Sequence, residues 1–478
     1  MSKKSIKMGA IALVGVMTAG FAGCGTTASA SVVEATTHEK ESYYTFTFDR
    51  FGSDVMPLGA YIGPFGESSW QGTYIPSTVT DENYATAYEC GLNFFAAMKQ
   101  DYNTNPEETM LALDLADRNE IVLYIQDTAL FSLGADKRAP LAKTDFEARV
   151  SAYRDHPAFA GIVGRDEPFG FELRACGEVQ DRFDEVFPEG SYGLYMNSNG
   201  YQCPQGWLNG GRNGESDPLW EGEDLNKEWT YEQYIRNYIE AMDGAKFYSY
   251  DVYPFMSENN LRSSYFVNLQ LVRDLTIEYE IPFWAFIQSG CYYDNERSWN
   301  WQPDEGDLLW NVNTSLAYGA KGIQYFPYAH PAEFSASQSG EPSLVGRYGE
   351  KTERWYYAQK ANKQIQAIDH ILMNAAHMGM MAHGSTPCPI PENSTLASFR
   401  EIKNLSGDAS LVGCFDYNGK TALYVVNNSL EKDKAKITLE FDNTYAYEVT
   451  QAAEKFNVAG KKLTLTLAEG QGALVVLK

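Results

Sequence analysis

Two carboxyl side chains are adjacent in the sequence, Asp166 and Glu167, directly before Pro168. Neighbouring carboxyl groups at a partly buried site raise each other's pKa, so that one of them can stay protonated near neutral pH. A protonated carboxyl in that position can donate a proton to a leaving group, which is general acid catalysis. A purely structural role is the alternative, because both carboxylates could pair with Arg165 or cap the next helix.

Other short apolar runs of the chain also end in polar or aromatic side chains. Asp251 and Tyr253 lie at the end of the run 247–252. If these runs are parallel strands, their carboxyl ends meet at one rim, where the reactive groups of an α/β barrel project. Such a rim of carboxyl, amide, hydroxyl and ring groups suits a polyhydroxylated ligand. The further candidate contacts with this ligand are Asp127, Asn197, Gln288, Tyr325 and Trp284.

These runs recur at intervals of about 30 to 55 residues, and each interval can hold one helix. Eight such units are the number at which a parallel sheet closes into a barrel. An open doubly wound sheet is the competing topology, but no glycine-rich fingerprint follows the first run. We therefore predict a (β/α)8 TIM barrel over residues 43–385. Its strands are expected at 56–62, 92–98, 121–126, 159–164, 192–197, 247–252, 283–288 and 322–327.

The pattern changes after a long helical stretch at 350–373 and three prolines at positions 387, 389 and 391. Short alternating runs follow, with turn residues such as Asn418 and Gly419 between two of them. We predict an all-β sandwich over residues 386–478. Its strands are expected at 410–415, 421–427, 435–441, 445–450, 462–467 and 472–477.

Segment 156–168 resembles the fourth-strand motif of glycoside hydrolase barrels, including cellulase-like and β-galactosidase-like enzymes. Segment 316–326 is similar to the entry into strand eight of the same enzymes, and 422–429 is similar to part of their accessory domains. The resemblance implies that Glu167 is the general acid/base of a glycoside hydrolase, with a direct role for Asp166 as a further expectation. A glycosidic oxygen is a poor leaving group, and it therefore needs such a proton donor.

The second carboxylate departs from the family pattern, because Gln288 occupies the end of strand seven, where retaining enzymes place a nucleophilic Glu. An amide cannot form the glycosyl–enzyme ester, which leaves three alternatives. Asp251 could be the base of an inverting reaction, about 6.5–9.5 Å from Glu167. Alternatively, an N-acetyl group of the substrate could be the nucleophile, polarised by Asp166 or Asp251 and held by Tyr253. In the third alternative the barrel binds a glycan without cleaving it.

The composition limits the ligands that the protein can bind. The 478 residues carry a formal net charge of −25, which repels nucleic acid and anionic lipid surfaces. Aromatic residues make up 14% of the chain and provide flat faces on which sugars can stack, although core packing is an equal alternative for each tryptophan, Trp284 included. The glycine-rich stretch 199–226 is long enough for a lid or the wall of a subsite. We expect a carbohydrate substrate and no metal or organic cofactor.

The N-terminus has the features of an export signal. Lysines at positions 3, 4 and 7 precede an apolar run at 8–22, which is too short to remain as a membrane span. Residues 20–24 resemble the lipobox of bacterial lipoproteins, with Phe21 in place of the usual Leu and Cys24 as the acylated residue. An ordinary signal peptide cleaved near Ala30 is the alternative. We predict a signal peptide at 1–23, a flexible tether at 24–42, and a protein that faces outward from the bacterial membrane.

Overall fold

Eight parallel strands form a closed barrel in the computed structural model, which describes residues 44–70, 73–131, 140–188, 192–208, 229–257, 260–293, 298–299, 301–329 and 342–478. All eight predicted strands are confirmed, each close to its predicted bounds, and so is the (β/α)8 fold. Around the barrel the strands are hydrogen-bonded in the order β1, β14, β11, β8, β7, β6, β5 and β4. Their bounds are β1 Leu58–Tyr61, β4 Phe94–Asp101, β5 Val122–Gln126, β6 Phe159–Asp166, β7 Gly193–Ser198, β8 Tyr248–Tyr250, β11 Phe283–Gln288 and β14 Gly322–Phe326.

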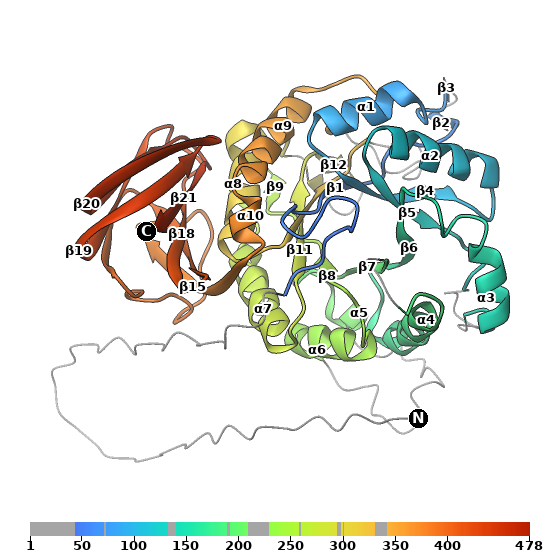
Figure 1. Ribbon diagram of the computed structural model, residues 1–478, viewed down its shortest axis with the longest axis horizontal. Helices are drawn as coiled ribbons and strands as arrows, with labels where there is room; N and C mark the ends of the chain where they lie inside the picture. The colour runs from blue at the N-terminus through green and yellow to red at the C-terminus, as the bar shows by residue number, and fades with distance from the viewer. Residues whose placement is uncertain are drawn as a thin grey trace, which may run out of the picture. The chain divides into compact units, whose positions relative to one another are not determined.

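Helices surround these strands (Figure 1). Several begin at a residue whose side chain caps the free N–H groups of the first turn, as Thr230 and Asp304 do. The helices are α1 Asp81–Glu89, α2 Pro106–Arg118, α3 Lys143–Val150, α4 Leu173–Val186, α5 Gln205–Leu208, α6 Tyr231–Ala241, α7 Tyr265–Glu278, α8 Glu305–Ala317, α9 Glu353–Gln366 and α10 Asp369–Leu372. Shorter elements lie in the connections: β2 Ser68–Trp70, β3 Thr73–Ile75, η1 Gly170–Glu172, β9 Phe255–Ser257, β10 Asn260–Leu261, β12 Tyr292–Tyr293 and β13 Ser298–Trp299.

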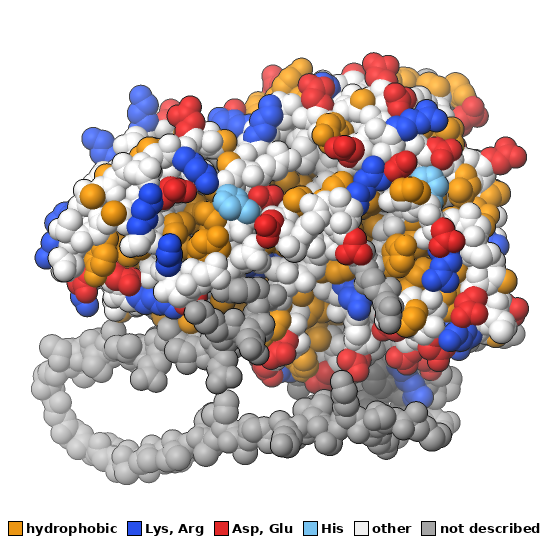
Figure 2. Space-filling view, viewed as in Figure 1, with side chains coloured by type: hydrophobic (Ala, Val, Ile, Leu, Met, Phe, Trp, Pro, Cys, Tyr) orange, Lys and Arg blue, Asp and Glu red, His pale blue; other side chains and the backbone are white. Residues whose placement is uncertain are grey.

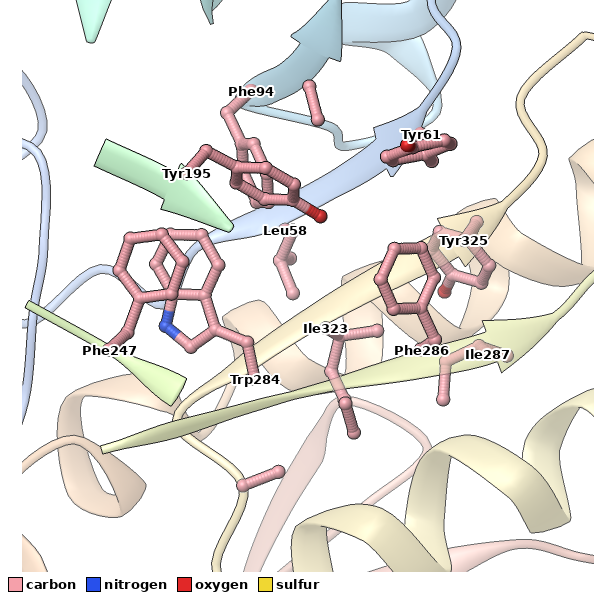
Figure 3. Close-up of a cluster of buried hydrophobic side chains, with 14 of the residues drawn as sticks. Leu58, Tyr61, Phe94, Tyr195, Phe247, Trp284, Phe286, Ile287, Ile323 and Tyr325 are labelled. Atoms are coloured by element: carbon pink, nitrogen blue, oxygen red, sulfur yellow. The ribbon is translucent and has the colours of Figure 1, made fainter. Parts of the chain in front are cut away.

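Aromatic side chains fill the amino-terminal end of the barrel interior. Trp284, near the start of β11, stacks on Phe247 with ring centroids 3.7 Å apart and an interplanar angle of 3° (Figure 3). Phe46 and Phe48, from the segment before β1, pack against the same Trp284 ring. The prediction that Trp284 contacts a sugar is therefore wrong: its side chain is fully buried at the end of the barrel opposite to the rim.

The C-terminal β domain is also confirmed, but its strands form one antiparallel sheet of seven strands. Side chains from all seven strands of this sheet form an apolar core of their own. The domain begins at β15, about ten residues before the predicted boundary. The predicted runs 435–441 and 445–450 are joined in the single strand β19. The strands are β15 Ala375–His383, β16 Ile402–Gly407, β17 Ser410–Tyr417, β18 Lys420–Asn427, β19 Ala435–Gln451, β20 Glu454–Leu467 and β21 Gly472–Leu477.

The β domain packs against α8 of the barrel through polar contacts that are themselves buried. Trp310 donates its indole N–H to the Asn428 side-chain oxygen at 2.8 Å. Asn313 accepts a hydrogen bond from the Tyr424 hydroxyl and donates one to the Gly470 carbonyl. Every residue of α8 after Glu305 is buried as a result. Its buried polar side chains, such as Asn313, are therefore hydrogen-bonded, as burial requires.

The remaining observations concern the surface and the cysteines. Acidic and basic side chains are interspersed over the face seen in Figure 2. None of the helices in the described ranges is long and apolar enough to cross a membrane. The six cysteines of the described residues are free thiols, and five of them are buried.

Replacing Trp284 with Ala tests its assignment to the core. Removing this fully buried ring is expected to lower the free energy of unfolding by about 3–5 kcal/mol, because the apolar contacts are lost and a cavity remains. Urea denaturation followed by circular dichroism measures the change. Tyr348→Ala, at a side chain that is 58% exposed, is the control and should change stability by less than about 0.5 kcal/mol. Equal stability of the two variants would contradict the core assignment.

Candidate active site

Three neighbouring strands bring Asp166, Asn197 and Asp251 together at the carboxyl-terminal rim. Asp166 is the last residue of β6 and pairs in register with Asn197 of β7. Asn197 in turn pairs with Ser249 of β8, two residues before Asp251. Because parallel strands keep their carboxyl ends at the same edge, the three side chains converge there.

The Asn197 side chain connects the two aspartates. Its amide nitrogen donates to one oxygen of Asp166 and to one oxygen of Asp251, each at 3.2 Å. Glu167 also hydrogen-bonds Asp251 through its side chain, so all three carboxyl groups belong to one cluster. Asp251 and Asn197 are almost completely buried. The structure therefore brings together four of the predicted site residues.

Burial determines the ionisation of this cluster. Loss of hydration raises the pKa of Asp251 to about 7, and the negative charge of Asp166 contributes in the same direction. The hydrogen bonds from Asn197 and Glu167 oppose the increase, because they stabilise the ionised form. Loss of hydration also raises the pKa of Asp166. At neutral pH the cluster can therefore hold both a proton and a negative charge, as acid/base chemistry requires.

Glu167 has an unusual backbone conformation, with φ of +46°. This left-handed region costs a residue other than glycine about 1–3 kcal/mol and persists only where the surroundings impose it. The Glu167 amide donates to the Asn197 carbonyl at 2.8 Å. The next carbonyl, that of Pro168, accepts hydrogen bonds from the Tyr234 hydroxyl at 2.7 Å and from the Asn199 side chain at 3.0 Å. These buried contacts hold the turn that carries Glu167.

The sequence also allowed a purely structural role for Asp166 and Glu167, in which they pair with Arg165 or cap the next helix. The structure gives these two tasks to another residue. Arg165 forms its ion pair with Glu172, at 3.2 Å. The Glu172 side chain also caps the following 3₁₀ turn by accepting from the Phe169 amide. Both tasks of the structural alternative are therefore performed by Glu172.

Two tyrosine side chains complete the surroundings of the carboxyl cluster. Tyr253 is buried, and its pKa is raised well above the ordinary value by burial and by the charges of Asp251, Glu167 and Asp166. Tyr61, at the end of β1, lies beside Asp166. Its buried hydroxyl lies close enough to the Asp166 carboxylate to favour the ionised form of that group. Sequence reasoning missed Tyr61, although its position at the end of the first strand was the available signal.

Two of the predicted ligand contacts have structural roles instead. The carboxylate of Asp127 is fully buried and is bound by Arg149 at 2.7 Å and by the Tyr153 hydroxyl at 3.0 Å. The hydroxyl of Tyr325 donates to the side chain of Asn362 on α9, so it points away from the barrel interior. Both predictions of ligand contact are therefore wrong.

The side chain of Gln288 likewise forms its hydrogen bonds with the backbone. Its side-chain oxygen accepts from the Phe255 amide and its nitrogen donates to the Phe255 carbonyl, both at 2.9 Å. The amide thus ties the end of β11 to the segment after β8. It is a buried structural group and not the predicted substrate contact. Cys24 and most of the predicted lid, residues 209–226, lie outside the described residues.

No group of three or more His, Cys, Asp or Glu side chains in the described ranges is arranged to hold a metal ion. The described groups at the rim are the carboxyl cluster, its amide donor Asn197 and the two tyrosines.

Comparison with known proteins agrees with the resemblance seen in the sequence. Residues 225–368 match the family model of glycoside hydrolase family 42, described as beta-galactosidase. This match includes Asp251 and ends beyond β14, but it begins after Asp166 and Glu167. No curated protein matches the sequence.

Solved structures with a similar chain trace include several glycoside hydrolases. A β-galactosidase from Marinomonas ef1 is 11% identical over 68% of this chain and 62% of its own, with a TM-score of 0.44. A family 5 glycoside hydrolase from Bacteroides vulgatus is 9% identical over 88% and 89%, with a TM-score of 0.47. This chain therefore spans about three fifths of the length of the Marinomonas β-galactosidase. The family match and the closed barrel confirm the resemblance to glycoside hydrolase barrels and support a glycosidase.

Proposed function

We propose that this protein hydrolyses glycosidic bonds of an oligosaccharide or glycan at the carboxyl-terminal rim of its barrel. The observation that carries the proposal is the carboxyl cluster at the rim, in which the Asn197 amide donates to both Asp166 and Asp251 and Glu167 acts on Asp251. In this proposal Glu167 is the proton donor and Asp251 is the second carboxyl group. The family match makes aryl β-galactosides the first substrates to test.

We propose a reaction that retains the anomeric configuration, because Glu167 and Asp251 belong to the same carboxyl cluster at the rim. An inverting reaction needs a water molecule between carboxyl groups that are about 6.5–9.5 Å apart, whereas retaining enzymes place them about 5–5.5 Å apart. The spacing that the two carboxyl groups adopt around a bound sugar decides between these reactions, and inversion with Asp251 as the base is the alternative that the product analysis below tests.

The proposed reaction has two steps. An oxygen of ionised Asp251 attacks the anomeric carbon while Glu167 transfers its proton to the glycosidic oxygen, and the bond to the leaving group breaks. Water then attacks the same carbon and gives a proton to Glu167, which releases Asp251 as a carboxylate. Charge on Asp166 stabilises the positive character that develops on the sugar ring. The Tyr61 hydroxyl lies buried beside Asp166, where its contact favours the ionised form of that carboxyl.

We also infer that the protein is exported and attached to the bacterial membrane by a lipid on Cys24. The support is the lysine-rich start, the short apolar run and the lipobox-like segment 20–24. Labelling cells with an azido or alkyne fatty acid should mark the wild-type protein and not Cys24→Ala. Equal labelling of both proteins would exclude acylation at this cysteine.

Replacing Glu167 with Gln tests the proton donor. The amide keeps the size of the side chain but cannot transfer the proton, so kcat on an oligosaccharide substrate should fall by about 10²–10⁴-fold. Glu147→Gln, at an exposed carboxylate on α3, is the matched control and should keep wild-type turnover. Equal turnover by wild type and Glu167→Gln would refute the assignment. A wild type that binds glycans but cleaves none would favour the binding-protein alternative.

The pH dependence tests the role of Asp251. Its pKa is raised to about 7, and the ionised form is the proposed nucleophile. The fraction of the active form grows with pH, so kcat/KM should increase between about pH 6 and pH 8. Asp251→Asn should abolish turnover, whereas Asp114→Asn, at an exposed carboxylate on α2, should keep the profile. Full activity at pH 5 would contradict the role of Asp251.

The anomeric configuration of the first product, followed by proton NMR, distinguishes the remaining alternatives. Retention with 2-hydroxy sugars supports Asp251 as the nucleophile. Cleavage confined to 2-acetamido sugars would support the N-acetyl group of the substrate instead, and inversion would overturn both.

A further inference from the structure

A chain of hydrogen bonds runs through the barrel interior from Tyr195 to the carboxyl cluster. The Tyr195 hydroxyl donates to the side-chain oxygen of Gln324 at 2.5 Å, and the Gln324 nitrogen donates to the Ser249 hydroxyl at 2.9 Å. Ser249 donates to the side-chain oxygen of Asn197 at 3.0 Å. The Asn197 nitrogen then donates to Asp166 and Asp251. We call Tyr195, Gln324 and Ser249 the relay.

The three relay residues come from different strands and are all buried. Tyr195 lies on β7, Ser249 on β8 and Gln324 on β14. Each is at most 1% exposed. Figure 3 shows the Tyr195 hydroxyl inside the barrel, between the aromatic floor around Trp284 and the rim at Tyr61. Because burial makes an unpaired polar group costly, each member depends on its neighbour in the chain.

The hydrogen bonds of the relay can be donated in only one direction, from Tyr195 toward Asn197. An amide oxygen only accepts and an amide nitrogen only donates, so Tyr195 must be the donor to Gln324. Ser249 accepts from the Gln324 nitrogen, and its single proton is therefore left for the Asn197 oxygen. A network of this kind determines which way an amide side chain faces. With its oxygen bound by Ser249, Asn197 turns its nitrogen toward both aspartates.

We propose that Tyr195, Gln324 and Ser249 are positioning residues that lock the Asn197 amide with its nitrogen facing Asp166 and Asp251. The inference rests on the proposed function for its catalytic meaning, but the orientation of Asn197 can be tested without a substrate. None of the three side chains is required to touch the sugar. Their hydrogen bonds reach the two aspartates through Asn197.

The locked orientation favours the ionised form of Asp251. A nitrogen that donates to a carboxylate stabilises the charged state, whereas a flipped Asn197 would present its oxygen and stabilise a protonated carboxyl. Without the relay, Asn197 is free to flip when Asp251 binds a proton. The pKa of Asp251 should then rise above its value of about 7 in the wild type.

The other titratable groups around Asp251 are the same in wild type, Ser249→Ala and Ser198→Ala, whereas Tyr195→Phe removes one buried hydroxyl. The tyrosines among them stay protonated over the range of interest, because burial raises their pKa above the ordinary value. Asp166 and Glu167 are present in every variant, so their effect on Asp251 is common to all of them. The groups that face Asp251 are Asp166 and Glu167 from the end of β6, Tyr195 from β7, and Tyr248, Tyr250 and Tyr253 from β8 and the segment after it.

The test is a carbon-13 NMR titration of aspartate side chains in the full-length protein, with the Asp251 signal assigned by its loss in Asp251→Asn. In Ser249→Ala the titration midpoint of Asp251 should move upward by about 0.5–1 pH unit, because the flipped amide becomes accessible. Tyr195→Phe removes only the first hydrogen bond of the relay, the one to Gln324, and should move the Asp251 midpoint upward by a smaller amount. The acidic limb of the kcat/KM profile should move with the NMR midpoint.

Ser198→Ala is the matched control. Ser198 is also a fully buried serine next to Asn197 in the chain, but its hydroxyl bonds Tyr248 at 2.7 Å and lies outside the relay. This variant should leave the Asp251 midpoint unchanged, and thermal unfolding of both alanine variants verifies that they fold. An Asp251 midpoint that is the same in Ser249→Ala and Ser198→Ala would overturn the relay.

The two proposals fail in distinguishable ways. If the wild type cleaves glycosides but Ser249→Ala leaves the Asp251 midpoint in place, the relay is wrong and the proposed function stands. If no glycoside is cleaved but the midpoint moves as expected, the relay is supported and the hydrolase assignment is wrong.

Discussion

The candidate site depends on how the protein keeps negative charge in a place with little water. Asp166 and Asp251 approach each other at the barrel rim, and the Asn197 nitrogen between them supplies hydrogen bonds to both. A carboxylate without such donors would take up a proton instead of remaining charged, because burial penalises the ionised form. Asn197 leaves Asp251 near the point of balance, with a pKa of about 7. A balanced carboxyl is more useful for catalysis at neutral pH than one that is always charged or always neutral.

The aromatic interior below the rim helps to keep Asp251 between its charged and neutral forms. Trp284, Phe247, Phe46 and Phe48 close the amino-terminal end of the barrel with stacked and edge-on rings. Electrostatic interactions are stronger where rings replace water, so each hydrogen bond near the rim has a larger effect on ionisation. The aromatic content of the chain therefore contributes to the chemistry indirectly. The aromatic rings exclude water from the barrel interior beneath the polar network of the rim.

The eight barrel strands could be predicted because buried parallel strands are short, nearly continuous apolar runs separated by helices. The prediction of Glu167, Asp251, Asn197 and Tyr253 as neighbours followed from one rule about strand ends, and the structure brings them together. The same rule failed for Tyr325, because successive side chains of a strand point to opposite faces. Gln324 faces the interior and Tyr325 faces α9, and a run of letters does not reveal which of two neighbours turns inward.

Other features depended on contacts between distant parts of the chain. Gln288 is bound by Phe255, and Asp127 is bound by Arg149, so neither is available to a ligand, and no local pattern signals either contact. The strand β15 was missed because its methionines, glycine and histidines resemble neither an alternating strand nor a helix. It is stabilised by pairing with β17, more than 25 residues later.

The contact between α8 and the β domain has a consequence for how this protein could have diversified. Modules that exchange freely between proteins meet through small, polar, wet surfaces, so that either partner remains soluble alone. Here one helix belongs to two cores at once, because it covers β11 on one side and meets β18 and β21 on the other. Any ancestral recombination that separated barrel from sheet would have exposed Trp310 and its apolar neighbours to water. We therefore expect the two domains to have been inherited as a pair, with variation concentrated in the loops above the rim.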